Sequence, residues 1–326
     1  MKNFQDLPDE LVLKILSYSE TKDLIRCGQV SKRTRRISHD STLWVLANFE
    51  KEIVKTELLE IVFEKGCRIL RLHNSTIIGS LSSNLRPQLR ILNFSQPVTD
   101  GENSKVLEEL LYSCCSLQSL EMEGVLLTPK MVEGIWYKNR KTLQRLNLNF
   151  SDIHYLIHNP NRQYLKKIIN LCQELKEVDL AYVDDYKHRT AGGLPDDNLE
   201  FLVKKIPPNV EKFNVMGNRF TDDHVKILLG RCKKIKVFSL EATRITDDSL
   251  KNIERHLFNT LEELSLGRTL QHPNITISLT GFLGLKSMPR LKILNVYSQK
   301  DGEEIQCVRC HLPHRNLSGL WRKWLA

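Results

Sequence analysis

One short apolar pattern recurs along most of this chain of 326 residues and constrains its fold more than any other feature. The pattern places apolar residues at the first, fourth and sixth positions of a six-residue segment. Stacked units of this kind form a solenoid, in which each unit buries its apolar face against its neighbours. Nine matches exclude chance: CRILRL, LRILNF, LQSLEM, LQRLNL, LKEVDL, VEKFNV, IKVFSL, LEELSL and LKILNV.

The spacing of these segments indicates the class of repeat. From the second segment on, they open at Leu89, Leu117, Leu143, Leu175, Val210, Ile235, Leu261 and Leu291. Neighbouring openings therefore lie 25 to 35 residues apart, around the period of leucine-rich repeats. Between them, strings such as TDDHVKILL and TDDSLKNIE supply caps and amphipathic helix starts. We expect an α/β solenoid of about nine strand-plus-helix repeats over residues 67–304.

Acidic residues recur at these helix starts, at Asp196, Asp222 and Asp247. Clustered carboxylates can ligate a metal ion, but repetition at successive helix starts favours a role in capping. We therefore expect no metal site there.

Cysteines recur with the repeats as well. Cys114, Cys172 and Cys232 each lie three residues before a repeat opens, which favours small, buried packing residues. A chain of this length needs no disulfide framework. Because no apolar run reaches eighteen residues and no signal-peptide pattern is present, we expect a cytoplasmic and nuclear protein without a membrane partner.

The first fifty residues predict several short helices. Pro8 suits a first helical turn, and Thr21, Ser31 and then Asp40 or Ser41 can cap three more. Four helices of this length bury little apolar surface. Their exposed apolar residues therefore either contact a partner or pack on the following domain. We place this all-helical domain at residues 1–50 and a helical linker at residues 51–66.

The string LPDELVLKILSYSETKDLIRCGQVSKRTRRISHDSTLW resembles an F-box, with LPDEL at its start, VSKR in its middle and LW at its end. With the repeats, it makes the chain resemble the F-box/leucine-rich-repeat family. The resemblance implies the substrate-recognition subunit of an SCF ubiquitin ligase, whose F-box binds Skp1 and through it a cullin and a RING protein. Thr34 departs from the family, which usually has an aromatic there, so we expect weaker local packing. The residues implied for the Skp1 interface or its support are Leu7, Pro8, Leu11, Ile15, Leu24, Val30 and Trp44.

The strands of such a solenoid line one concave face, where side chains beside the buried leucines point outward. A mixed polar strip of this kind suits protein recognition better than a phosphate backbone. The resemblance adds Tyr182 as an aromatic contact and Arg268 as a basic one, and it implies a protein client, phosphorylated in family members, with a Cks protein as accessory. An arginine can bind phosphate through charge-assisted hydrogen bonds. The pattern itself gives the substrate-binding candidates Arg145, Asn147, Asp179, Lys212, Asn214, Glu241 and Tyr297.

The net charge of +9 raises the question of nucleic acid binding. Much of the excess lies in a basic tail, residues 305–326, and a basic stripe with interleaved aromatics is absent, so we expect no nucleic acid partner.

The string CVRCHLPH crowds Cys307, Cys310, His311 and His314 into eight residues without a second C-x-x-C. We therefore expect neither zinc nor haem, and no cofactor. No G-x-x-x-x-G-K, G-x-S-x-G or H-E-x-x-H string is present, so we expect a non-catalytic adaptor. The alternative is a repeat scaffold that binds partners without recruiting a ligase.

Overall fold

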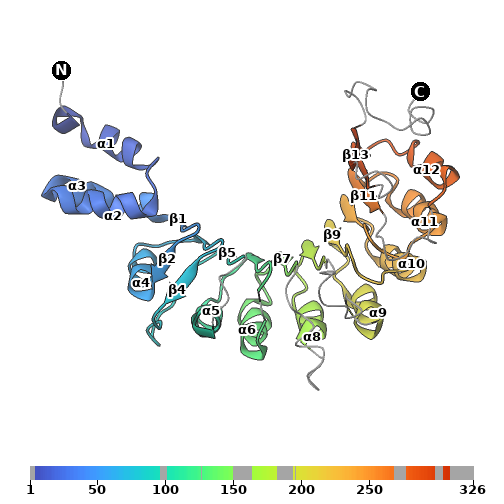
Figure 1. Cartoon of the computed structure of the whole chain (residues 1–326), viewed down its shortest axis with the longest axis horizontal. Helices are drawn as coiled ribbons and strands as arrows, with labels where there is room; N and C mark the ends of the chain where they lie inside the picture. Colours follow the sequence, from blue (N-terminus) through green and yellow to red (C-terminus); the bar gives the residue numbers. More distant parts are fainter. Residues whose placement is uncertain are drawn as a thin grey trace. The chain divides into compact units, whose positions relative to one another are not determined.

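A computed structural model of the chain describes residues 4–95, 101–125, 127–149, 164–181, 194, 196–267, 277–297 and 304–308. It divides into two compact units, Met1–Leu143 and Gln144–Ala326, each described by itself below. In both units short parallel strands form a sheet, and helices cover one face of it (Figure 1). Within the described residues, no helix combines the length and the apolar character needed to cross a membrane.

The first unit begins with short helices, as the sequence predicts. Asp9 and Glu10 lie in the first turn of α1, where the positive end of the helix favours acids. Ser31 caps α3 by accepting a hydrogen bond from the Thr34 backbone at 3.1 Å. The fourth predicted helix is a single 3-10 turn, and the chain then enters a strand at Leu46. The elements are η1 (Phe4–Asp6), α1 (Asp9–Leu16), α2 (Thr21–Val30), α3 (Lys32–Ser38) and η2 (Ser41–Trp44).

The rest of this unit alternates strands and helices. Four parallel strands form its main sheet, in the order β1-β3-β5-β6, and β2 pairs with β4 in a separate two-stranded sheet. The strands are β1 (Leu46–Asn48), β2 (Ile53–Lys55), β3 (Ile69–Arg71), β4 (Thr76–Ile78), β5 (Ile91–Asn93) and β6 (Ser119–Glu121). The helices are α4 (Thr56–Glu64), α5 (Gly101–Ser113), α6 (Pro129–Glu133) and the π-helix η3 (Gly134–Lys138).

The repeat pattern starts earlier than the residue 67 that the sequence predicts. Ala47 pairs with Leu70 in β3. Residues 51–66, expected as a helical linker, contain the helix α4 and also the strand β2. Trp44, Ala47 and Phe49 occupy the first, fourth and sixth positions of one more segment, and all three are buried. Because Trp, Ala and Phe replace leucine there, the segment does not stand out in the sequence.

The second unit repeats one strand and one helix. Six strands run parallel in the order β7-β8-β9-β10-β11-β12, and β13 pairs antiparallel with β12. The strands are β7 (Arg145–Asn147), β8 (Glu177–Asp179), β9 (Lys212–Asn214), β10 (Val237–Ser239), β11 (Glu263–Gly267), β12 (Ile293–Tyr297) and β13 (Glu304–Val308). The helices are α8 (Tyr164–Leu171), α9 (Asp196–Lys205), α10 (Asp222–Arg231), α11 (Asp247–Leu257) and α12 (Leu279–Leu285).

Each of the nine predicted segments contains a strand, which confirms the leucine-rich-repeat fold. In both units the core lies between strands and helices, and residues at the first, fourth and sixth positions, such as Leu117, Leu120 and Met122, are buried. The outermost element, β13, lies where the sequence predicts only the start of the basic tail.

The recurring cysteines are buried packing residues, as expected. Cys114, Cys172 and Cys232 are fully buried. Burial raises the pKa of Cys232 to about 11, and it raises that of Cys114 further. A thiol with such a pKa stays protonated at neutral pH and is a poor nucleophile.

Candidate protein-binding surfaces

An exposed apolar row runs along α1 in the first unit. Leu11 is 50% exposed and Ile15, one helical turn further, is 45% exposed, so both present apolar surface on the same helix face. Tyr18 continues this spacing and is exposed, with the Lys14 amine 5.1 Å from its ring. The prediction missed Tyr18, although the i, i+4, i+7 spacing from Leu11 signals it.

The other residues predicted for the Skp1 interface fall into two groups. Val30, at the end of α2, is 77% exposed; Pro8 is also exposed and Leu7 is half-buried. Leu24 and Trp44 are each only 3% exposed, and the Trp44 indole donates to the Ser38 carbonyl at 2.7 Å. These two belong to the core beneath the surface, because apolar spacing alone does not separate a buried helix face from an exposed one.

Asp9 fixes the start of α1 against α3. Its carboxylate accepts a hydrogen bond from Arg33 Nε at 2.8 Å and forms an ion pair with Arg36. Arg33 also donates to the Leu7 carbonyl. The LPDEL segment is thereby held in place by Arg33, the last residue of VSKR, and by Arg36, three residues further on.

Thr34, the departure from the family pattern, has a defined structural role. The Thr34 hydroxyl accepts a hydrogen bond from the Ser31 backbone at 3.0 Å, and the Ser31 hydroxyl accepts one from the Thr34 backbone at 3.1 Å. This reciprocal pair is a capping box at the start of α3. Thr34 therefore helps to cap α3 at the position where the family usually has an aromatic, and the weaker local packing expected there stays a prediction.

The sheet face away from the helices carries most substrate-binding candidates of the second unit. Arg145 and Lys212 are exposed, and the Lys212 amine lies 3.3 Å from a Glu177 carboxylate oxygen on the neighbouring strand. Asn214 donates to Asp179 at 3.1 Å, which joins β8 to β9. The face is therefore a strip of cross-strand polar pairs.

The candidates near the strand ends also shape the chain. The side-chain oxygens of Asn147, Asp179 and Asn214 each accept a hydrogen bond from the backbone two residues on, at 2.8, 3.1 and 3.0 Å. Such Asx turns direct the chain away from the sheet. These side chains are half-buried and have a structural role beside any contact with a client.

Four candidates remain: Glu241, Tyr297, Tyr182 and Arg268. Glu241 is half-buried and follows β10. Tyr297 ends β12, but its side chain is not described. Tyr182 and Arg268 lie outside the described residues, so their predicted contacts remain predictions.

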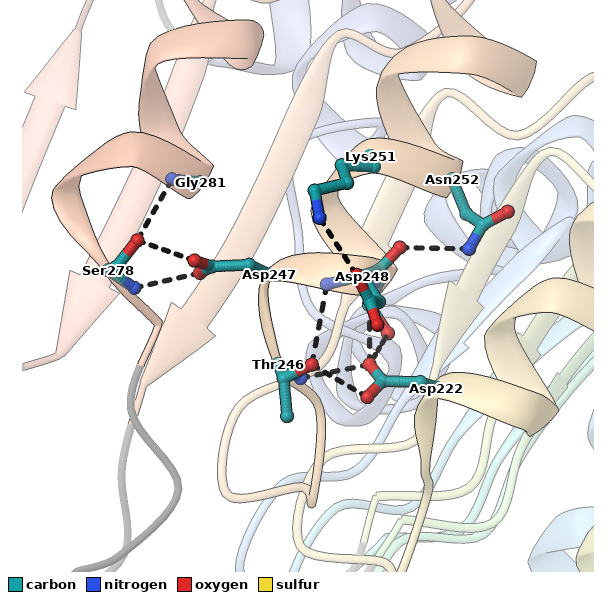
Figure 2. A network of polar contacts seen from close by, with 9 residues as sticks. Asp222, Thr246, Asp247, Asp248, Lys251, Asn252, Ser278 and Gly281 are labelled. Carbon is teal, nitrogen blue, oxygen red and sulfur yellow. Dashed lines mark hydrogen bonds and ion pairs between the residues drawn. The ribbon is translucent and has the colours of Figure 1, made fainter.

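Two of the acids at the helix starts, Asp222 and Asp247, bind the next repeat (Figure 2). Asp222 accepts hydrogen bonds from Thr246 and Ser249, and Asp247 accepts them from Ser278. Among the described residues, no three His, Cys, Asp or Glu side chains gather as metal ligands would. Of CVRCHLPH, the described part ends at residue 308, within β13, which leaves Cys310, His311 and His314 outside it.

Comparison with known proteins identifies both modules. The family model of F-box-like domains matches residues 4–48, and the model of the SKP2 LRR domain matches residues 57–319. One FBD-associated F-box protein of Arabidopsis thaliana is 25% identical over 347 aligned positions, covering 93% of this chain and 79% of its own length. A second from the same plant is 22% identical over 347 positions, covering 94% of this chain and 85% of its own length. The actin-binding site 2 of leiomodin-1 covers 44% of this chain and 81% of its own at 20% identity, with a TM-score of 0.33, too low to bear on function.

Proposed function

Because the chain belongs to the F-box proteins with a leucine-rich-repeat domain of the SKP2 type, we propose that it is the substrate-recognition subunit of an SCF ubiquitin ligase. Its F-box binds Skp1, which joins it to a cullin and a RING protein. Its repeat domain holds a protein client for ubiquitination and proteasomal degradation. The chain is a non-catalytic adaptor in the cytoplasm and nucleus, and other subunits transfer the ubiquitin.

The exposed apolar row on α1 carries the proposal. Leu11 and Ile15 lie on α1 and Tyr18 lies in the turn just after it, all within the residues that match the F-box model. Exposed apolar side chains grouped in this way mark interaction sites, and burying them stabilises a complex by about 25 cal/mol per Å² of apolar surface. Their position supports Skp1 as the protein that covers them.

The sheet face of the second unit supports client binding. Its exposed cations Arg145 and Lys212 lie among half-buried amides and carboxylates, a mixture suited to a protein surface. A client held there has a high effective concentration at the tethered ubiquitin-loaded enzyme. A phosphorylated client and a Cks accessory protein belong to this proposal through the family resemblance.

Co-purification tests the proposal in two steps. The full chain should co-purify with Skp1, and with a cullin only when Skp1 is present. Substitution of Leu7, Pro8 and Leu11 by polar residues should abolish co-purification with Skp1 and with the cullin. If the unmodified chain does not bind Skp1, the alternative of a repeat scaffold without ligase recruitment is favoured.

Client capture under proteasome inhibition tests the second half. The double variant Arg145→Glu and Lys212→Glu should lose clients that the parent chain captures while it still binds Skp1. An unchanged client set would place client binding elsewhere on the chain.

A further inference from the structure

One edge of the sheet in the second unit carries a ladder of alternating charges. It consists of the residues just before the strands, Lys176, Glu211, Lys236, Glu262 and Lys292. Each of the last four donates its backbone N–H to the carbonyl of the one before, at 2.7 to 2.8 Å. Backbone pairing therefore fixes their order and spacing along the edge.

The two glutamates of this ladder are already paired. Glu211 accepts a hydrogen bond from Lys236, and Glu262 accepts one from Lys292, each at 2.6 Å. These hydrogen bonds lower the pKa of both carboxyls, so both stay ionised. Lys176 and Lys234 add to the lowering at Glu211. Each glutamate thus sits among more than one cation.

The loops from helix to strand add further cations beside the ladder. Lys234 donates to Asn209 at 2.8 Å, and Arg290 is close enough to influence the pKa of both Lys236 and Glu262. Lys233 contacts His256 of the next repeat, with the amine 2.8 Å from Nδ1. This is a contact between two basic side chains, in which the neutral imidazole accepts from the ammonium. The positive charge of this edge therefore reaches across repeat boundaries.

The opposite edge carries acids at three of its helix starts. The helices begin there, with pairs of aspartates in the first turns of α9, α10 and α11. Helix dipoles favour acids at helix starts and bases at helix ends. That effect fades beyond the terminal turn, whereas Lys233, Lys234 and Arg290 lie in loops after the helices. The edge with the ladder therefore carries more positive charge than the stabilisation of helix ends requires.

We propose that this basic edge binds an acidic segment of a partner protein, independently of the F-box. The basic edge consists of Lys176, Arg231, Lys233, Lys234, Lys236, Arg255, Arg290 and Lys292. The acids in the five helix-to-strand loops of this unit are Glu174, Glu211 and Glu262.

The arrangement of charges favours a protein segment over nucleic acid or a lipid surface. Glu211 and Glu262 interrupt the row of cations and would face a continuous phosphate backbone with like charge. An acidic segment carries its charges on separate side chains and can place neutral residues opposite the two glutamates. Phe258, 39% exposed after the end of α11, offers an apolar contact that a phosphate backbone does not use.

Fluorescence anisotropy with the full chain tests the proposal. The probe is a fluorescein-labelled peptide of alternating glutamate and serine with a central phenylalanine. The double variant Lys233→Glu and Arg290→Glu should weaken its binding about tenfold, as several lost and reversed surface charge interactions would. The neutral variant Lys233→Gln and Arg290→Gln should weaken it by less, and circular dichroism should show that both variants are folded.

A matched control reverses two lysines on the helices, Lys226→Glu and Lys251→Glu, and should leave the affinity within about twofold. The proposal would be overturned if the control lost as much peptide affinity as the double variant Lys233→Glu and Arg290→Glu, or if that double variant lost none. Single-stranded RNA and vesicles containing phosphatidylserine are the competing probes. Binding of either as tight as the peptide, and lost in the edge variant, would show a general polyanion surface and overturn it as well.

Discussion

Asp222, in the first turn of α10, accepts hydrogen bonds from the backbone N–H of Thr246 at 2.9 Å and from its hydroxyl at 2.7 Å. Thr246 is the N-cap of the next helix, α11. Asp222 also accepts from the Ser249 backbone at 3.1 Å. One repeat therefore satisfies donors at the helix start of the next, which would otherwise lack partners inside the helix.

We predict that Asp222→Ala destabilises the second unit by about 2–3 kcal/mol, because the variant loses charge-assisted hydrogen bonds and leaves helix-start donors unpaired. Thermal unfolding followed by circular dichroism measures the effect. The control is Asp223→Ala, which removes an exposed acid from the same turn and should change stability by no more than about 0.5 kcal/mol. Equal losses of stability in both variants would mean that negative charge in the first turn of α10 stabilises the unit, and that the hydrogen bonds between the repeats do not.

Two helical glycines in the second unit should respond oppositely to alanine. A methyl group at Gly230 meets nothing within 4 Å, so Gly230→Ala should stabilise the protein by about 0.5–1 kcal/mol through helix propensity. A methyl group at Gly281 would clash with the Asp247 carboxylate, which accepts from the Ser278 backbone at 2.8 Å. Gly281→Ala should therefore lower the melting temperature. A rise in the melting temperature for both substitutions would contradict the close approach of Asp247 to Gly281.

Stability should fall in mild acid because of His224. Its Nδ1 accepts a hydrogen bond from the Thr221 backbone at 3.2 Å, as part of the capping box of α10. Burial lowers the pKa of His224 below 6.5, although Asp196 and Asp223 oppose the shift. Between the folded and unfolded pKa the unfolded chain binds more protons. The stabilisation that the neutral His224 ring provides is thus complete above pH 6.5. It is lost as the pH falls through the pKa that His224 has in the folded chain.

We predict a steeper fall in melting temperature from about pH 7.5 to about pH 5.5 for the parent chain than for His224→Asn. The asparagine oxygen can accept the same hydrogen bond without titrating. Parallel curves for the two proteins would exclude His224 as the source.

Trp44 should act on folding rather than binding. Because it is buried and hydrogen-bonded to Ser38, we predict that Trp44→Ala costs about 3–5 kcal/mol of unfolding free energy. Urea unfolding of the parent and variant measures the loss. Val30→Ala, at an exposed position, should stay within about 0.5 kcal/mol. A small loss for Trp44→Ala would show that its burial contributes little.

The repeat strands and the F-box helices could be predicted from sequence because both rest on local spacing. The nine segments differ in composition, yet their apolar positions recur, and each contains a strand. The segment around Ala47 was not predicted because its apolar residues are Trp, Ala and Phe instead of leucine. The strand β13 was not predicted because its pairing with β12 depends on tertiary contact and not on local spacing.

The candidate sites were less predictable because a single sequence does not show burial. Leu11 and Leu24 are both leucines on F-box helices, yet one is half exposed and the other is core. The link from Asp222 to Thr246 spans two repeats, so the spacing of the acids indicated structure but not the partner. The basic edge could not be predicted for the same reason, since its lysines and arginines come from three loops and from the ends of α10 and α11, which only the fold brings together.

Skp1 binding by the exposed face of α1 can be tested with one matched pair of substitutions. Ile15 on α1 and Ile61 on α4 are each 45% exposed, but only Ile15 lies in the residues that match the F-box model. Isothermal titration of Skp1 into the full chain should give an affinity at least about tenfold weaker for Ile15→Asp, since hot-spot substitutions cost more than about 1.4 kcal/mol. Ile61→Asp should bind like the parent chain. Equal Skp1 affinity for all three proteins, or no binding by the parent chain, would show that α1 does not form the Skp1-binding surface.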